Sequence, residues 1–157
     1  MDMIDSFAKT RRKKSAASSL SIRENTFKNG VKRIVGETGR FKDWGGETSD
    51  LYTTRLRVGG GRKAAAFGFK GKGLTGVLTP ARMGKNGDQI PRLFQEDADV
   101  FIVQYGGQIA GSVMQQMAVY AQHKSLATGR TVFYGTMNGQ DSALLVAAYP
   151  RAFRAKA

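Results

Sequence analysis

Apolar and polar residues alternate with a period of two in the first half of the chain. The stretch DLYTTRLRV at 50–58 alternates in this way and is rich in β-branched and aromatic residues, which predicts a strand. The glycines of GGGR at 59–62 then turn the chain, and KAAAFGFKGK at 63–72 predicts a returning strand. We therefore expect an antiparallel hairpin that pivots at Gly60.

A period of 3.6 residues precedes the hairpin. Four apolar residues recur at the spacing of one helix face: Phe27, Val31, Ile34 and Val35. This helix is expected to begin near Ser19 or Ser21 and to end at GETG, residues 36–39.

Helices and strands alternate after the hairpin. Helical patterns occupy 88–96, with Asp88 as an N-cap candidate, 112–129 and part of 138–150. Apolar, β-branched runs at 98–105 and 130–137 predict two more strands. The order α-β-β-α-β-α-β-α predicts an α/β (α+β) fold, in which helices flank a central mixed sheet.

The domain organisation is expected to be simple. Residues 1–19, with KTRRKK at 9–14, lack apolar periodicity and are predicted to form a flexible basic arm. Residues 20–157 are long enough for one core and contain no repeat or linker. We expect a single domain at 20–157.

Composition excludes several classes of protein. No cysteine and a single histidine, His123, exclude disulfides, thiolate metal sites and multi-histidine metal sites. No apolar run has the length of a membrane helix, and no apolar segment follows the basic cluster at the N-terminus, as it would in a secretory signal. A soluble intracellular protein without a membrane partner is expected, in the cytoplasm or associated with the nucleoid.

Charge points to a polyanionic partner. The net charge is +13, and residues 51–85 carry eight basic side chains and no acidic one. A surface of one sign attracts nucleic acid, because neutralising phosphates releases condensed counterions. The residues expected to hold the backbone come from the N-terminal arm and from 51–85: Arg11, Arg12, Lys13, Lys14, Arg55, Arg57, Arg62, Lys63, Lys72, Arg82 and Lys85.

The hairpin offers a candidate chemical site. With a pivot at Gly60, paired positions have numbers that sum to 120, so Asp50 is expected opposite Lys70 on one face of the sheet. A shift of the register by one residue would break this pairing. The alternative interpretation is an exposed ion pair, which contributes only about 0–1 kcal/mol.

These residues resemble the PD-(D/E)XK nuclease superfamily, which includes restriction, homing and junction-resolving endonucleases. The resemblance covers roughly 20–138 and rests on a helix bearing Glu24, a strand with Asp50 and a strand ending in Lys70. It implies a restriction-endonuclease-like αβββαβ core in which carboxylates hold Mg²⁺ or Mn²⁺ and the lysine activates water or stabilises the developing charge.

The resemblance assigns Asp50 to the metal and Asp50 with Lys70 to catalysis, but it departs from the family pattern at one position. Where the family has Glu, Asp or Gln, this chain has Gly68. Other oxygen ligands must then complete the site. The candidates are Glu24, Glu47 and Asp88, with Gln89 and Lys72 in supporting roles. Two of these residues have an alternative role: Asp88 as a helix cap, and Glu24 as a solvated residue or a partner of Arg23 or Lys28.

Two functions follow as hypotheses. The first is a metal-dependent DNA endonuclease that hydrolyses phosphodiester bonds and works as a homodimer or homotetramer, with one site for each strand. The second, favoured by Gly68, is a non-catalytic nucleic-acid-binding protein with a degenerate nuclease fold. RNA is an alternative partner to DNA in both. A third possibility is a basic subunit of a ribonucleoprotein.

Overall fold

A four-stranded mixed sheet forms the centre of the protein in the computed structural model, which describes residues 3–12, 20–37, 49–71 and 74–154. The strands lie in the order β1 (Leu51–Val58), β2 (Gly61–Lys70), β3 (Val100–Tyr105) and β4 (Phe133–Met137). The first pair is antiparallel, and β3 and β4 continue parallel to β2. The predicted α/β class with a mixed sheet is therefore confirmed.

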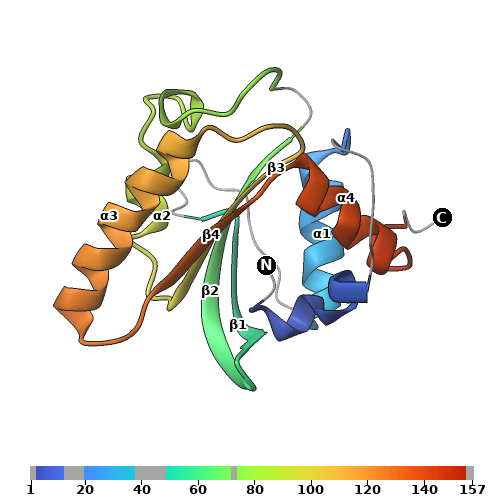
Figure 1. Ribbon diagram of the computed structural model, residues 1–157, viewed down its shortest axis with the longest axis horizontal. Coiled ribbons are helices and arrows are strands. Elements are labelled where there is room, and N and C mark those ends of the chain that lie inside the picture. Colours follow the sequence, from blue (N-terminus) through green and yellow to red (C-terminus); the bar gives the residue numbers. More distant parts are fainter. Residues whose placement is uncertain (1–2, 13–19, 38–48, 72–73, 155–157) are drawn as a thin grey trace.

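Helices cover both faces of this sheet (Figure 1). One face carries α2 (Gln89–Leu93) and α3 (Gly111–Thr128), and the other carries α1 (Glu24–Val35) and α4 (Gly139–Ala148). Two 3₁₀ helices complete the described elements, η1 (Asp5–Arg12) and η2 (Pro80–Arg82). The predicted order of helices and strands is confirmed.

The pleat of β2 divides the core into two layers. Ala65, Phe67 and Phe69 belong to the apolar cluster beneath α1 and α4, whereas Ala66 belongs to the cluster beneath α2 and α3. All six residues of β3 are buried, because this strand is covered on both faces. By the same alternation, Gly68 and Lys70 lie on the α2 side of β2.

The hairpin register differs from the prediction. The turn has two residues, Gly59 and Gly60, with φ of 59° and 83°, a conformation that favours glycine. Paired positions next to the turn therefore sum to 119, and an irregularity between Thr53 and Leu56 lowers the sum to 118 farther on. Asp50 comes opposite Gly68, and the expected pairing of Asp50 with Lys70 is wrong.

The N-terminal segment also differs in part from the predicted flexible arm. Residues Asp5–Arg12 form η1, and Phe7 is fully buried in the cluster beneath α1 and α4. The Tyr149 hydroxyl accepts a hydrogen bond from Lys9 N at 3.2 Å and donates one to Ser6 O at 2.9 Å. The remainder of the predicted arm, residues 13–19, lies outside the described residues.

Helix ends follow local rules. The first helix begins at Glu24, later than Ser19 or Ser21, and ends at Gly36, whose φ is 78°. At the start of α4, the side chains of Asn138 and Asp141 each accept the backbone N–H of the other residue, which forms a capping box. Among the helices that the structure describes, none has the length and hydropathy needed to cross a bilayer.

Candidate functional site

Asp50 lies directly before β1 and faces the C-terminal part of β2. Its backbone N–H donates to Phe67 O at 2.9 Å. Its Oδ2 accepts the backbone N–H of Phe69 at 2.7 Å and the side-chain amide of Gln89 at 3.3 Å. These bonds hold the carboxylate beside Gly68, since hydrogen bonds to an ionised acceptor are the strong ones.

Gly68 leaves the space that Gln89 occupies. A Cβ added at position 68 would lie 3.3 Å from Gln89 Nε2, and no other atom of the described residues beyond its chain neighbours lies within 4 Å of it. The amide of Gln89 therefore lies where a side chain at position 68 would project. Sequence reasoning named Gln89 only as a supporting residue, and the structure brings it into contact with Asp50.

Lys70 and Glu24 line one cavity, of about 190 Å³, at the carboxyl ends of β2 and β3. The N-terminus of α1 packs on Gly71, where an added Cβ would lie 2.9 Å from Glu24 Cβ. The segment before α1 is fixed by a 2.9 Å hydrogen bond from Leu20 N to Gly106 O. Crevices at the carboxyl ends of parallel strands are common binding sites.

The cavity also contains a buried polar residue that sequence reasoning missed. Gln104 is 2% exposed, lines the cavity and donates to Ser142 Oγ at 2.9 Å. Because Gln104 lies within the buried run of β3, the sequence pattern did not distinguish it from the residues of the hydrophobic core. The amide adds a polar group to the wall formed by Glu24 and Lys70.

The structure does not bring all predicted residues together. Asp88 pairs with Arg92, at 3.5 Å between Oδ1 and Nε, and its side chain makes no cap hydrogen bond. Glu47 and Lys72 lie outside the described residues. The ion pairs of the described residues include none between Asp50 and Lys70.

The side chains of Asp50 and Gln89 offer a small set of oxygens to a magnesium or manganese ion. Gln89 Oε1 is buried without a hydrogen-bond partner, and a half-turn of the amide would direct this oxygen toward Asp50. Within the described part of the chain, no three acidic or histidine side chains gather around one point. Mg²⁺ is bound by one or two carboxylates and keeps several waters, so a small set of protein oxygens is compatible with this ion.

Five of the residues predicted to contact nucleic acid are exposed. Arg55, Arg57 and Arg62 project from the β1–β2 hairpin, Arg82 is the last residue of η2, and Lys85 lies on the loop before α2. Two more of the predicted residues interact with other side chains of the protein: Lys63 Nζ lies 5.5 Å from the Phe133 ring centroid, and Arg11 pairs with Asp5 at 3.2 Å. The side chain of Arg12, and all of Lys13 and Lys14, lie outside the described residues.

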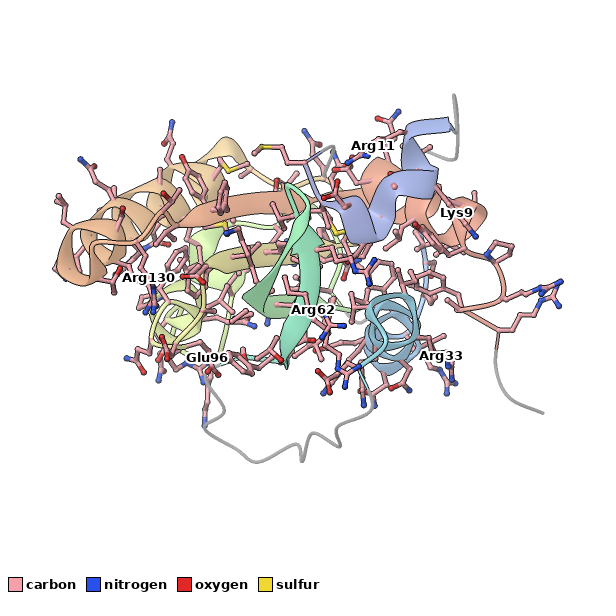
Figure 2. The ribbon with its side chains drawn as sticks, turned by 90° about the horizontal axis from the view of Figure 1, so that it is seen from below. Lys9, Arg11, Arg33, Arg62, Glu96 and Arg130 are labelled. Atoms are coloured by element: carbon pink, nitrogen blue, oxygen red, sulfur yellow. The ribbon has the colours of Figure 1, made fainter. Side chains whose placement is uncertain are left out.

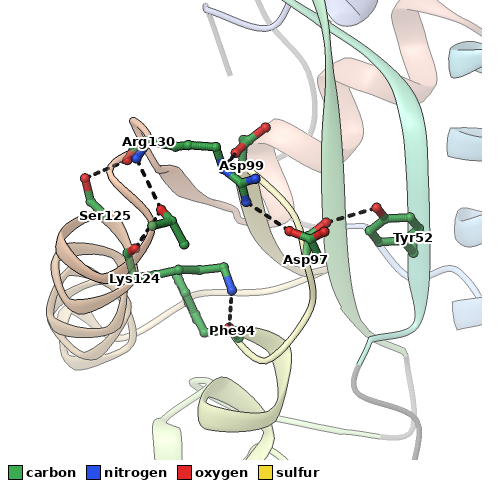
Figure 3. Close-up of polar contacts among 8 residues, drawn as sticks. Tyr52, Phe94, Asp97, Asp99, Lys124, Ser125 and Arg130 are labelled. Atoms are coloured by element: carbon green, nitrogen blue, oxygen red, sulfur yellow. Dashed lines mark hydrogen bonds and ion pairs between the residues drawn. The ribbon is translucent and has the colours of Figure 1, made fainter.

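A second polar cluster lies at the opposite end of β3 (Figure 3). Arg130 pairs with Asp97 at 2.9 Å and with Asp99 at 3.0 Å. The hydrogen bond from Arg130, with its charge, lowers the pKa of Asp97. Burial, followed by the negative charges of Asp97 and Glu96, raises the pKa of Tyr52, whose hydroxyl donates to Asp97 O at 2.9 Å. Asp97 and Asp99 are therefore paired with Arg130, and the cluster links the loop before β3 to β1 and to the segment before β4.

Comparisons with family models, with curated proteins and with solved structures find no match to this chain.

Proposed function

We propose that the protein is a metal-dependent DNA endonuclease with a PD-(D/E)XK-like core. The observation that carries the proposal is the contact between Asp50 and Gln89. This contact lies beside Gly68, which precedes Lys70 by two residues and shares its face of β2. A carboxylate, an amide oxygen and an ammonium group at one end of a basic molecule are suited to a phosphodiester substrate.

The residues would divide the chemistry among them. When bound, Mg²⁺ polarises a phosphate and lowers the pKa of a water. Asp50 and Gln89 would hold the ion, and the two hydrogen bonds on Asp50 Oδ2 keep that carboxylate in place before the ion arrives. Lys70 would stabilise the negative charge that grows on the phosphate oxygens.

Cleavage of plasmid and branched DNA with Mg²⁺ or Mn²⁺ tests this proposal. Asp50→Asn keeps an acceptor for the Phe69 N–H but removes the charge. We expect at least about a 100-fold loss of cleavage, because even residues that only support metal ligands contribute 10–100-fold. DNA binding without metal should be unchanged. The control is Asp88→Asn, which should cut normally, and equal cleavage by Asp50→Asn and the unaltered protein would refute the assignment.

A second candidate is a non-catalytic nucleic-acid-binding protein on the same fold. It is favoured by Gly68, which supplies no ligand, and by the Gln89 Nε2 group that already satisfies Asp50. In this case the unaltered protein would bind DNA or RNA with steep salt dependence and would cut neither with either metal. RNA retained through purification would indicate a role in a ribonucleoprotein.

The homodimer or homotetramer expected from the size of the chain remains part of the proposal. A domain with one site needs a second copy to cut both strands of a duplex. Sedimentation with and without a duplex would show whether two chains assemble on one DNA.

A further inference from the structure

A basic cleft lies at the far end of α1 from the candidate site. It has a volume of about 620 Å³ and lies between α1, η1 and the chain after α4. Its lining includes three cations, Lys9, Arg33 and Arg151, and no carboxylate. Figure 2 shows Lys9 and Arg33 at the same end of the molecule.

The cations of this basic cleft are held by groups that leave their charge intact. Arg33 Nη1 donates to Ala152 O at 2.6 Å and to Arg154 O at 3.4 Å. Lys9 Nζ lies 5.3 Å from the Tyr149 ring centroid. The ion pairs of the described residues include none with Lys9, Arg33 or Arg151. Three like charges around one hollow favour an anionic ligand.

A polar stripe connects this basic cleft with the candidate site. Asn25, Asn29 and Arg33 are exposed at intervals of four along α1, which places them in one row. The row begins beside Glu24, at the cavity that contains Lys70. Nine residues separate Glu24 from Arg33, which corresponds to about 14 Å at 1.5 Å per residue.

We propose that the basic cleft binds two neighbouring backbone phosphates, one at Arg33 and one at Arg151, of the same nucleic acid whose scissile phosphate lies beside Lys70. Phosphates of one strand follow each other at about 3.4 Å along the duplex axis, so 14 Å corresponds to about four nucleotides. The guanidinium groups of Arg33 and Arg151 match phosphate oxygens in geometry, and the asparagines of the stripe can donate to the phosphates between. This inference rests on the proposed function, because that function supplies the position of the scissile phosphate.

Salt dependence of binding in the absence of metal tests the inference independently of cleavage. Arg33→Gln combined with Arg151→Gln should make the negative slope of log K against log salt shallower by about 2, since each lost phosphate contact removes about 0.9 from its magnitude. Arg151→Gln alone, which removes no hydrogen bond seen in the described residues, should make the slope shallower by about 1 and guards against misfolding of the double variant.

The matched control is Arg130→Gln, which removes an arginine already paired with Asp97 and Asp99 and should leave the slope nearly unchanged. An unchanged slope in Arg151→Gln and in the double variant, or an equally shallower slope in Arg130→Gln, would overturn the inference. If the unaltered protein cuts DNA and the slope is unchanged in every variant, the result counts against the basic cleft and leaves the endonuclease proposal intact. If the slopes change in the cleft variants of a protein that cuts no DNA, the result supports the basic cleft and counts against the endonuclease proposal.

Discussion

At the scale of single residues, the central feature is a carboxylate that two hydrogen bonds hold in place. Asp50 takes its position from the Phe69 N–H and from Gln89, and Gly68 gives the amide room. Composition and pattern could identify Asp50, Lys70 and Gln89 as candidates because polar residues at strand ends and helix starts stand out. They could not place Gln89 against Asp50, since that contact joins elements 39 residues apart.

Gly68→Glu should strengthen the metal site. The position lies in a strand with no positive φ, and the nearest atom to an added Cβ is the end of the flexible Gln89 side chain, so the substitution should be tolerated. A second carboxylate beside Asp50 should tighten Mn²⁺ binding at least about tenfold. Isothermal titration would measure this, with Gly135→Glu on β4 as the control; equal affinities in all three proteins would contradict the expected geometry.

The pair between Asp97 and Arg130 should make stability depend on pH in acid. The pKa of Asp97 is lowered in the folded chain, so the pair stabilises the fold above the ordinary pKa of an aspartate, and this contribution is lost as pH falls through the lowered value. Arg130→Met should therefore be less stable than the unaltered protein at neutral pH, and the difference should shrink below about pH 4. Urea unfolding at several pH values measures it; a difference independent of pH would contradict the assignment.

At the scale of elements, alternation predicted the hairpin but not its register. The chain DLYTTRLRV gives no sign of the irregularity between Thr53 and Leu56, which moves every pairing beyond it by one position. The pattern also failed to predict η1, because two apolar residues, Ile4 and Phe7, are too few to form a period. Both residues are buried because they pack in the cluster beneath α1 and α4. Helices with continuous apolar faces and glycine ends were predicted well.

The capping box of α4 should contribute measurably to stability. Asn138→Ala removes the acceptor for Asp141 N and should lower the free energy of unfolding by about 1 kcal/mol. Urea denaturation with an unchanged m-value would measure the loss. Asn29→Ala, in the exposed middle of α1, is the control and should be neutral or slightly stabilising; equal stability of Asn138→Ala and the unaltered protein would contradict the role of the cap.

At the scale of the whole molecule, charge is distributed unevenly. Lys9 and Arg33 lie at one end, and Glu96 and Arg130 lie at the other (Figure 2). The acidic end places Asp97 and Asp99 around Arg130, which neutralises that arginine, while the basic cleft retains its charge. A polyanion would therefore approach with its strand along α1 and away from the acidic loops. The polyanionic partner expected from the net charge stays a prediction, and only the fold could bring Lys9, Arg33 and Arg151 together.

The most direct measurement is the binding of Mn²⁺ to three proteins, followed by electron paramagnetic resonance of the free ion. The account predicts one ion per chain for the unaltered protein and for Asp88→Asn, and affinity at least about tenfold weaker for Asp50→Asn. Equal binding by Asp50→Asn and the unaltered protein, or no binding by any of the three, would contradict a metal site between Asp50 and Gln89.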